Sequence, residues 1–117
     1  MDLRDKILGA DDLRRELVSV PEWDTDIYIQ EMTGSARDQY EASLIDKANL
    51  PTKEKLRNMR AELVVLTAVY ANGGRIFSDD DIELVGMKNA KVLTRLADTA
   101  QLVNRLKDEL IEDEAGN

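Results

Sequence analysis

The stretch 17–38, LVSVPEWDTDIYIQEMTGSARD, constrains the fold more than any other part of this chain. Apolar and polar residues alternate in 17–21 and again in 26–32, and β-branched side chains fill most of the apolar positions. That alternation is typical of strands with one buried face. The linker 23–26, WDTD, is short and polar, so the two segments are expected to form a β-hairpin. Because a lone hairpin is marginally stable in water, one of its faces should pack against helices.

This hairpin holds the candidate partner-binding residues. Pro21 cannot donate a sheet hydrogen bond, so the first strand either lies at a sheet edge or ends there. Trp23 is the only Trp of the chain, and two placements are open for it. It is exposed at the turn as part of an interface, where Trp is enriched, or it folds back onto the helices. The predicted partner-binding residues are Val20, Pro21, Trp23 and Tyr28.

A helix is expected directly after the hairpin. Thr33 or Ser35 can cap its N-terminus by accepting a hydrogen bond from a free backbone N–H group. The predicted helix runs to Ala48, and Pro51 marks the break that follows it, because the residue before a proline is biased away from helix.

The segment 53–71 is the strongest candidate for a core helix. Within it, 63–71 is nearly continuous in apolar residues and rich in valine, so a buried strand is the alternative there. The polar, helix-favouring residues 53–62 favour one helix over the whole segment. The turn 72–74, NGG, is expected to stop it.

Two further helices are predicted in the last third of the chain. Ser78 caps the first, whose opening turn carries three Asp residues, and Gly86 ends or kinks it. The last helix covers 89–110, with one apolar stripe formed by Leu93, Leu96, Ala100, Val103, Leu106 and Leu110. That stripe is either intramolecular core, which we favour, or a surface for a partner helix.

A length of 117 residues predicts a single domain. The expected fold is mainly α, in the α+β class, with one small N-terminal β-hairpin packed on about four helices. The predicted parts are a loosely held N-terminal segment 1–16, which includes a weak helix at 2–8, the hairpin 17–32, a helical region 33–110, and an acidic tail 111–117.

Composition argues against several functional classes. The chain has neither Cys nor His, which removes the commonest metal ligands and general bases. Its net charge of −8 disfavours nucleic acid and anionic membrane surfaces as partners. No apolar run approaches the roughly 20 residues of a membrane span, and the charged N-terminus is unlike a signal peptide. We therefore expect no cofactor, no metal, no membrane association, no export and no enzymatic activity.

Two local patterns fall short of binding motifs. The acidic run 79–81 lacks the glycine that a Ca²⁺ loop needs at its sixth position, which is Leu84 here. The segment 72–75, NGGR, lacks the spacing of a phosphate-binding loop.

The segment 18–41, VSVPEWDTDIYIQEMTGSARDQYE, resembles the tail assembly chaperones of long-tailed bacteriophages. The matching positions are Val18, Val20, Pro21, Glu22, Trp23, Ile27, Tyr28, Ile29, Thr33, Gly34, Arg37 and Asp38. The second half is also similar, through 60–63, the turn 74–78, the positions 81–86 and Asn104. Departures occur at Met32, at Ala36 and in 70–72, where other residues are usual.

The resemblance implies a protein that binds tail tube subunits and recruits them to the tape measure protein during tail assembly. It implies action in the host cytoplasm and absence from the mature virion. Family members often also have a longer product made by ribosomal frameshifting, and this chain would be the short form. The alternatives are a structural tail or connector component retained in the virion, or a small acidic inhibitor of a host protein.

Overall fold

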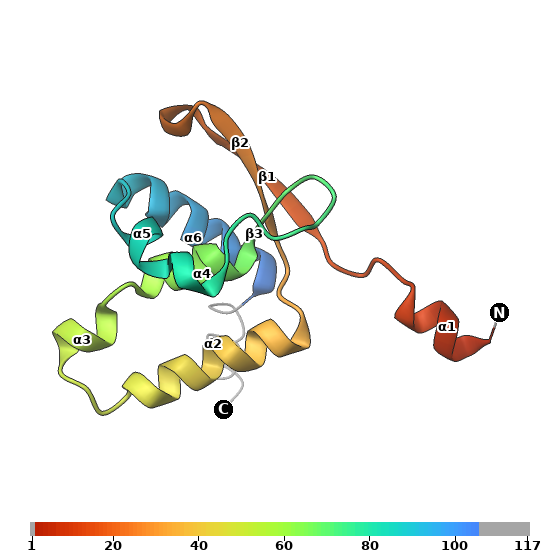
Figure 1. The fold of residues 1–117 in the computed structure, drawn as a ribbon, viewed down its shortest axis with the longest axis horizontal. Helices are drawn as coiled ribbons and strands as arrows, with labels where there is room; N and C mark the ends of the chain where they lie inside the picture. Colours follow the sequence, from red (N-terminus) through yellow and green to blue (C-terminus); the bar gives the residue numbers. More distant parts are fainter. Residues whose placement is uncertain (1, 106–117) are drawn as a thin grey trace.

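The computed structural model describes residues 2–105 of the chain, and within them the fold is mainly helical with a small antiparallel sheet, as predicted (Figure 1). The elements follow in the order α1 (Leu3–Leu8), β1 (Arg15–Val20), the 3₁₀ turn η1 (Pro21–Trp23), β2 (Thr25–Gln30), α2 (Gly34–Lys47), α3 (Thr52–Leu56), α4 (Met59–Thr67), β3 (Ala68–Val69), the 3₁₀ turn η2 (Asp79–Asp81), α5 (Ile82–Gly86) and α6 (Ala90–Asn104).

The predicted hairpin is present. β1 and β2 pair antiparallel with Val18 opposite Ile27 and Leu17 opposite Tyr28. The first strand begins at Arg15, two residues before the expected start. Both expectations for Pro21 hold, because β1 ends at Val20 and is also an outer strand in the order β1-β2-β3.

The predicted single helix 53–71 is wrong. It is divided into α3 and α4 at Asn58, whose φ of 55° lies in the left-handed region that Asn tolerates better than most residues. It also ends early, since α4 stops at Thr67 and Ala68–Val69 form β3 against β2. The end of the valine-rich stretch is therefore a strand, which was the alternative prediction for 63–71. A β-branched residue next to the open edge of a sheet is stabilised more by pairing with that edge than by a further helical turn.

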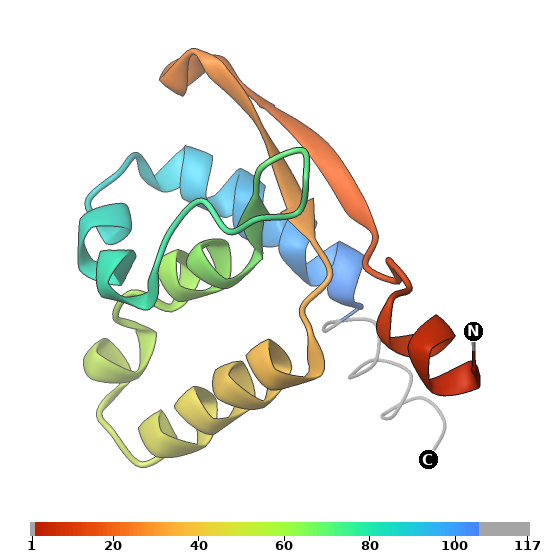
Figure 2. The ribbon, with the colours of Figure 1, turned by 45° about the vertical axis from the view of Figure 1, so that its right-hand side comes forward.

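The core lies between one face of the sheet and the helices α4 and α6. Val18, Val20, Ile27 and Ile29 share that face, and all are buried. Figure 2 shows the hairpin arching over α6. The described part of the α6 stripe, which includes Leu93, Leu96, Ala100 and Val103, is buried as well. The intramolecular reading of the stripe is thus confirmed for these residues, whereas Leu106, Leu110 and the tail 111–117 lie outside the described residues.

Helix termini largely follow their predicted caps. The Thr33 hydroxyl accepts a hydrogen bond from the Ala36 N–H at 3.0 Å and begins α2. Asn89 begins α6 by accepting from the N–H groups of Lys91 and Val92. These caps satisfy backbone donors that a helix leaves free in its first turn.

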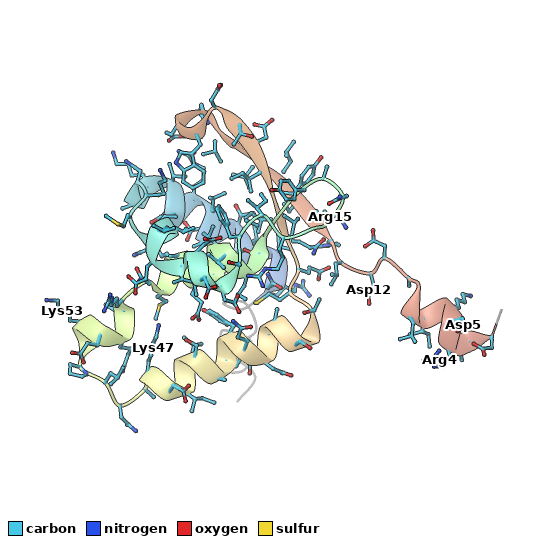
Figure 3. The ribbon with its side chains drawn as sticks, viewed as in Figure 1. Arg4, Asp5, Asp12, Arg15, Lys47 and Lys53 are labelled. Atoms are coloured by element: carbon cyan, nitrogen blue, oxygen red, sulfur yellow. The ribbon has the colours of Figure 1, made fainter. Side chains whose placement is uncertain are left out.

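Two helices bury few of their residues against the rest of the chain. α1 has no buried residue, and Leu3 on it is 70% exposed. Figure 1 shows α1 standing away from the rest of the chain. α2 buries one residue, Tyr40. Figure 3 places Arg4 and Asp5 on the projecting α1, and Lys47 and Lys53 around the junction of α2 and α3, far from the hairpin turn.

Candidate partner-binding cleft

An apolar cleft lies between the hairpin turn and α5. It has a volume of about 340 Å³ and is called the Trp23 cleft below. Its lining residues are Trp23, Phe77, Asp81, Leu84, Val85 and Lys88. Trp23 and Phe77 are half-buried and pack against the core, which supplies one side of the cleft with aromatic surface.

The turn that carries Trp23 is built from local backbone preferences. Pro21, with its restricted φ, occupies the first position of η1. Asp24 closes the turn in the left-handed region, with φ of 54°, and its N–H donates to the Pro21 carbonyl at 3.0 Å. Asp is among the residues that reach this region most readily.

The opposite side of the cleft is set by a capping box. The Ser78 N–H donates to the Asp81 carboxylate at 2.9 Å, and the 3₁₀ turn leads directly into α5. The predicted cap at Ser78 is thus confirmed. α5 buries Val85 but leaves Leu84 66% exposed, and Met87 just after it is 84% exposed. Leu84 therefore leaves apolar surface of the cleft lining open to a partner.

A charged pair fixes the hairpin turn to α6. Arg95 donates to both oxygens of Glu22, at 2.9 and 2.7 Å, and also to the Ser19 carbonyl at 3.4 Å. The hydrogen bond from Arg95 is the main reason that the pKa of Glu22 is lowered to about 2. Glu22 is therefore ionised at neutral pH, and the pair helps to hold Trp23 in its place.

The two chain segments that contribute Trp23 and Asp81 to the cleft are acidic. Seven carboxylates occur in the segments 22–26 and 79–83, namely Glu22, Asp24, Asp26, Asp79, Asp80, Asp81 and Glu83. Three of them pair with arginines: Glu22 with Arg95, Asp79 with Arg75, and Glu83 with Arg57. Hydrogen bonds from Arg75 and then Gln39 lower the pKa of Asp79. No described residue forms an ion pair with Asp24, Asp26, Asp80 or Asp81.

The four predicted site residues do not form one surface. Pro21 is exposed. Trp23 lines the cleft and is half-buried, so part of its side chain is open to a partner and part packs against the core. Each of the two placements expected for Trp23 therefore applies in part. Val20 is 0% exposed and belongs to the core, so its side chain is not available to a partner in the folded chain. Tyr28 lies opposite Leu17 on the other face of the sheet, away from the core.

Phe77, Leu84 and Lys88 were not predicted as site residues. They are more than fifty positions beyond Trp23 in the sequence. The adjacent apolar residues Leu84 and Val85 form a local pattern that the sequence shows. Their closeness to Trp23 has no such signal, because no local pattern links positions this far apart.

Within residues 2–105, no helix is long and apolar enough to cross a membrane. The same part of the chain contains no group of three or more acidic, His or Cys residues that could hold a metal ion.

Comparisons with known proteins place this fold in a family. A model of phage tail assembly chaperones matches residues 2–114. The chain belongs to the phage tail assembly chaperone family. The structure is also similar to that of the bacteriophage HK97 tail assembly chaperone, with a TM-score of 0.61 over 86% of this chain and 91% of that chain. Sequence identity to that protein is 20%, so this likeness concerns the fold. A search of curated protein sequences gave no match.

Proposed function

We propose that this tail assembly chaperone binds tail tube subunits and recruits them to the tape measure protein during tail assembly. The observation that carries the proposal is the family match over residues 2–114. The role needs a binding surface rather than reactive groups, so we infer that the protein is not an enzyme.

The Trp23 cleft is the part of this proposal that the structure supports most directly. Leu84, which lines this cleft together with Trp23 and Phe77, is 66% exposed. Covering such surface with a client contributes roughly 25 cal/mol per Å² of apolar area removed from water. Trp and other aromatic residues in partly buried pockets often dominate binding energy. We therefore assign client contact to Pro21, Trp23 and Leu84.

The outer edge of β1 offers a second contact. β1 is a terminal strand of the sheet, so backbone groups on one of its sides have no strand partner among the described residues. Leu17 on this strand is 55% exposed and lies opposite the half-buried Tyr28. An extended client segment can add to such an edge through main-chain hydrogen bonds. In this arrangement Tyr28 contacts the client from the outer face of the sheet.

The proposed role places the protein in the host cytoplasm during assembly and outside the mature virion. Mass spectrometry of purified particles tests this location. The chain should be absent from the particles, whereas one copy or more per tail would favour the alternative of a structural tail or connector component.

Co-expression with the tail tube protein of the same phage tests client binding. Size-exclusion chromatography should then show a soluble complex, and adding the tape measure protein should yield a ternary complex. The absence of any complex with the tube protein at micromolar concentration would rule the proposal out.

A further inference from the structure

We propose that the Trp23 cleft selects an apolar side chain carried on a basic segment, that is, an apolar anchor flanked by Lys or Arg. This inference rests on the proposed function, because it states which part of a client the cleft takes.

The shape and lining of the cleft favour a small apolar anchor. Its volume of about 340 Å³ is at the lower end of the range for ligand sites, about 300–1,000 Å³. Trp23, Phe77 and Leu84 contribute apolar surface, and the buried Val85 lies beneath them. One or two apolar side chains fit this description better than a large polar ligand does.

The charges around the cleft favour cations beside that anchor. Asp24 directly follows Trp23 in its turn, and Asp80 precedes Asp81 of the lining, whereas Asp26 lies on the outer face of the sheet with Tyr28. Asp24, Asp80 and Asp81 form no ion pair with a described residue, and Lys88 is the single cation of the lining. A basic segment would be attracted to this end of the molecule, and an acidic one repelled.

The cations of the helical region are not all remote from the cleft. The segment 47–60 carries Lys47, Lys53, Lys55, Arg57 and Arg60 against Glu54. Arg57 pairs with Glu83 of α5, whereas Figure 3 shows Lys47 and Lys53 at the corner of α2 and α3, away from the hairpin turn. A basic client segment is therefore directed to the turn that carries Trp23 and Asp24 rather than to this corner.

Two synthetic peptides of equal length, GKKLFKKG and GEELFEEG, test the selection. Trp23 is the only Trp of the chain, so its fluorescence reports on the cleft alone. The basic peptide should shift this emission and bind at least about tenfold more tightly than the acidic one. Its affinity should fall several-fold as salt rises from about 50 mM to about 300 mM, because exposed charges are screened. Equal affinities for the two peptides, or no binding of either, would overturn the inference.

Matched variants separate local charge from net charge. The double variant Asp24→Asn/Asp80→Asn should weaken binding of the basic peptide about three- to tenfold. Asn also tolerates the left-handed backbone at position 24. The control Asp12→Asn/Asp46→Asn removes the same charge at exposed sites elsewhere and should change affinity less than about twofold. Equal effects of the two double variants would show that net charge alone attracts the peptide, and would contradict the inference.

The apolar anchor is tested by Leu84→Ser, with Leu102→Ser as its control, since these side chains are 66% and 67% exposed. Only Leu84→Ser should reduce peptide binding, and both variants should keep the wild-type melting temperature.

The same variants examined with the tube protein distinguish the two proposals. A complex that forms and is weakened by Leu84→Ser and by Asp24→Asn/Asp80→Asn supports both. A complex that none of these changes weakens leaves the proposed function in place but overturns the inference. The absence of a complex with wild-type chain rules out the proposed function, while the peptide results still decide the selectivity of the cleft.

Sedimentation velocity tests whether a second copy of the chain occupies the cleft. Self-association that Leu84→Ser abolishes would identify the occupant as a second copy and overturn the inference.

Discussion

Arg95 of α6 holds the carboxylate of Glu22 through two hydrogen bonds, at 2.9 and 2.7 Å. The two residues are 73 positions apart, and their contact joins the hairpin turn to the central helix. Trp23 is the next residue after Glu22, so the pair lies beside a residue that lines the cleft.

The Glu22–Arg95 pair should make stability depend on acid pH. The pKa of Glu22 is lowered to about 2 in the folded chain from its ordinary value of 4.5, chiefly by the hydrogen bond from Arg95. The lowered pKa means that this contribution is fully present above about pH 4.5 and is lost as pH falls towards 2. Thermal unfolding of wild-type chain and of Glu22→Gln should therefore differ at pH 7 and converge between these two values. A constant difference across that range would contradict this role for Glu22.

Trp23→Ala should weaken client binding more than it lowers stability. Trp23 is half-buried, and its removal opens one side of the cleft. We expect a loss of about 2 kcal/mol or more in binding free energy, against about 1 kcal/mol in the free energy of unfolding. Calorimetric titration with the tube protein and urea denaturation measure the two quantities. If Trp23→Ala unfolds most of the protein while the molecules that stay folded bind the tube protein with wild-type affinity, then Trp23 is a core residue and not a binding residue.

Asn104→Ala should destabilise the whole domain. The side chain of Asn104 is buried, its Oδ1 accepts from the Met32 N–H at 2.7 Å, and its Nδ2 donates to the Ala100 carbonyl at 2.9 Å. Removing it leaves a part-buried backbone donor unsatisfied, at a cost of about 1–3 kcal/mol. Urea unfolding of Asn104→Ala beside Asn49→Ala, an exposed site between α2 and α3, measures the effect. The control should stay within about 0.5 kcal/mol of wild type, and a similar result for Asn104→Ala would show that another donor replaces it.

Gly73→Ala should destabilise the loop that follows β3. Gly73 has φ of 89°, and an added Cβ would meet the Arg15 guanidinium and lie 3.2 Å from Gln30 Oε1. The left-handed backbone alone costs roughly 1–2 kcal/mol for a residue with a Cβ. Gly34→Ala is the matched control, because nothing lies within 4 Å of a Cβ at that position. Thermal melting should show a loss for Gly73→Ala and none for Gly34→Ala; equal melting temperatures would mean that the loop relaxes freely.

Local patterns in the sequence were sufficient for much of the fold. The period-two alternation at 17–32 predicted the hairpin, because successive strand residues point to opposite faces. The caps at Thr33 and Ser78 were predicted from the hydrogen-bonding capacity of their side chains, and the apolar stripe of α6 from its spacing. The sequence also carried the family resemblance that the match over residues 2–114 confirms.

The family, the class of fold and most of the helices and strands can therefore be predicted from the sequence, since local patterns of neighbouring residues specify them. The tertiary structure alone decided that 53–71 divides at Asn58 and ends as β3, because the pairing partner of β3 is β2, about forty residues away. It also placed Val20 in the core and brought Trp23, Phe77 and Leu84 together as lining residues of one cleft. Those outcomes come from contacts between distant segments, and no local preference in either segment specifies the distance between them.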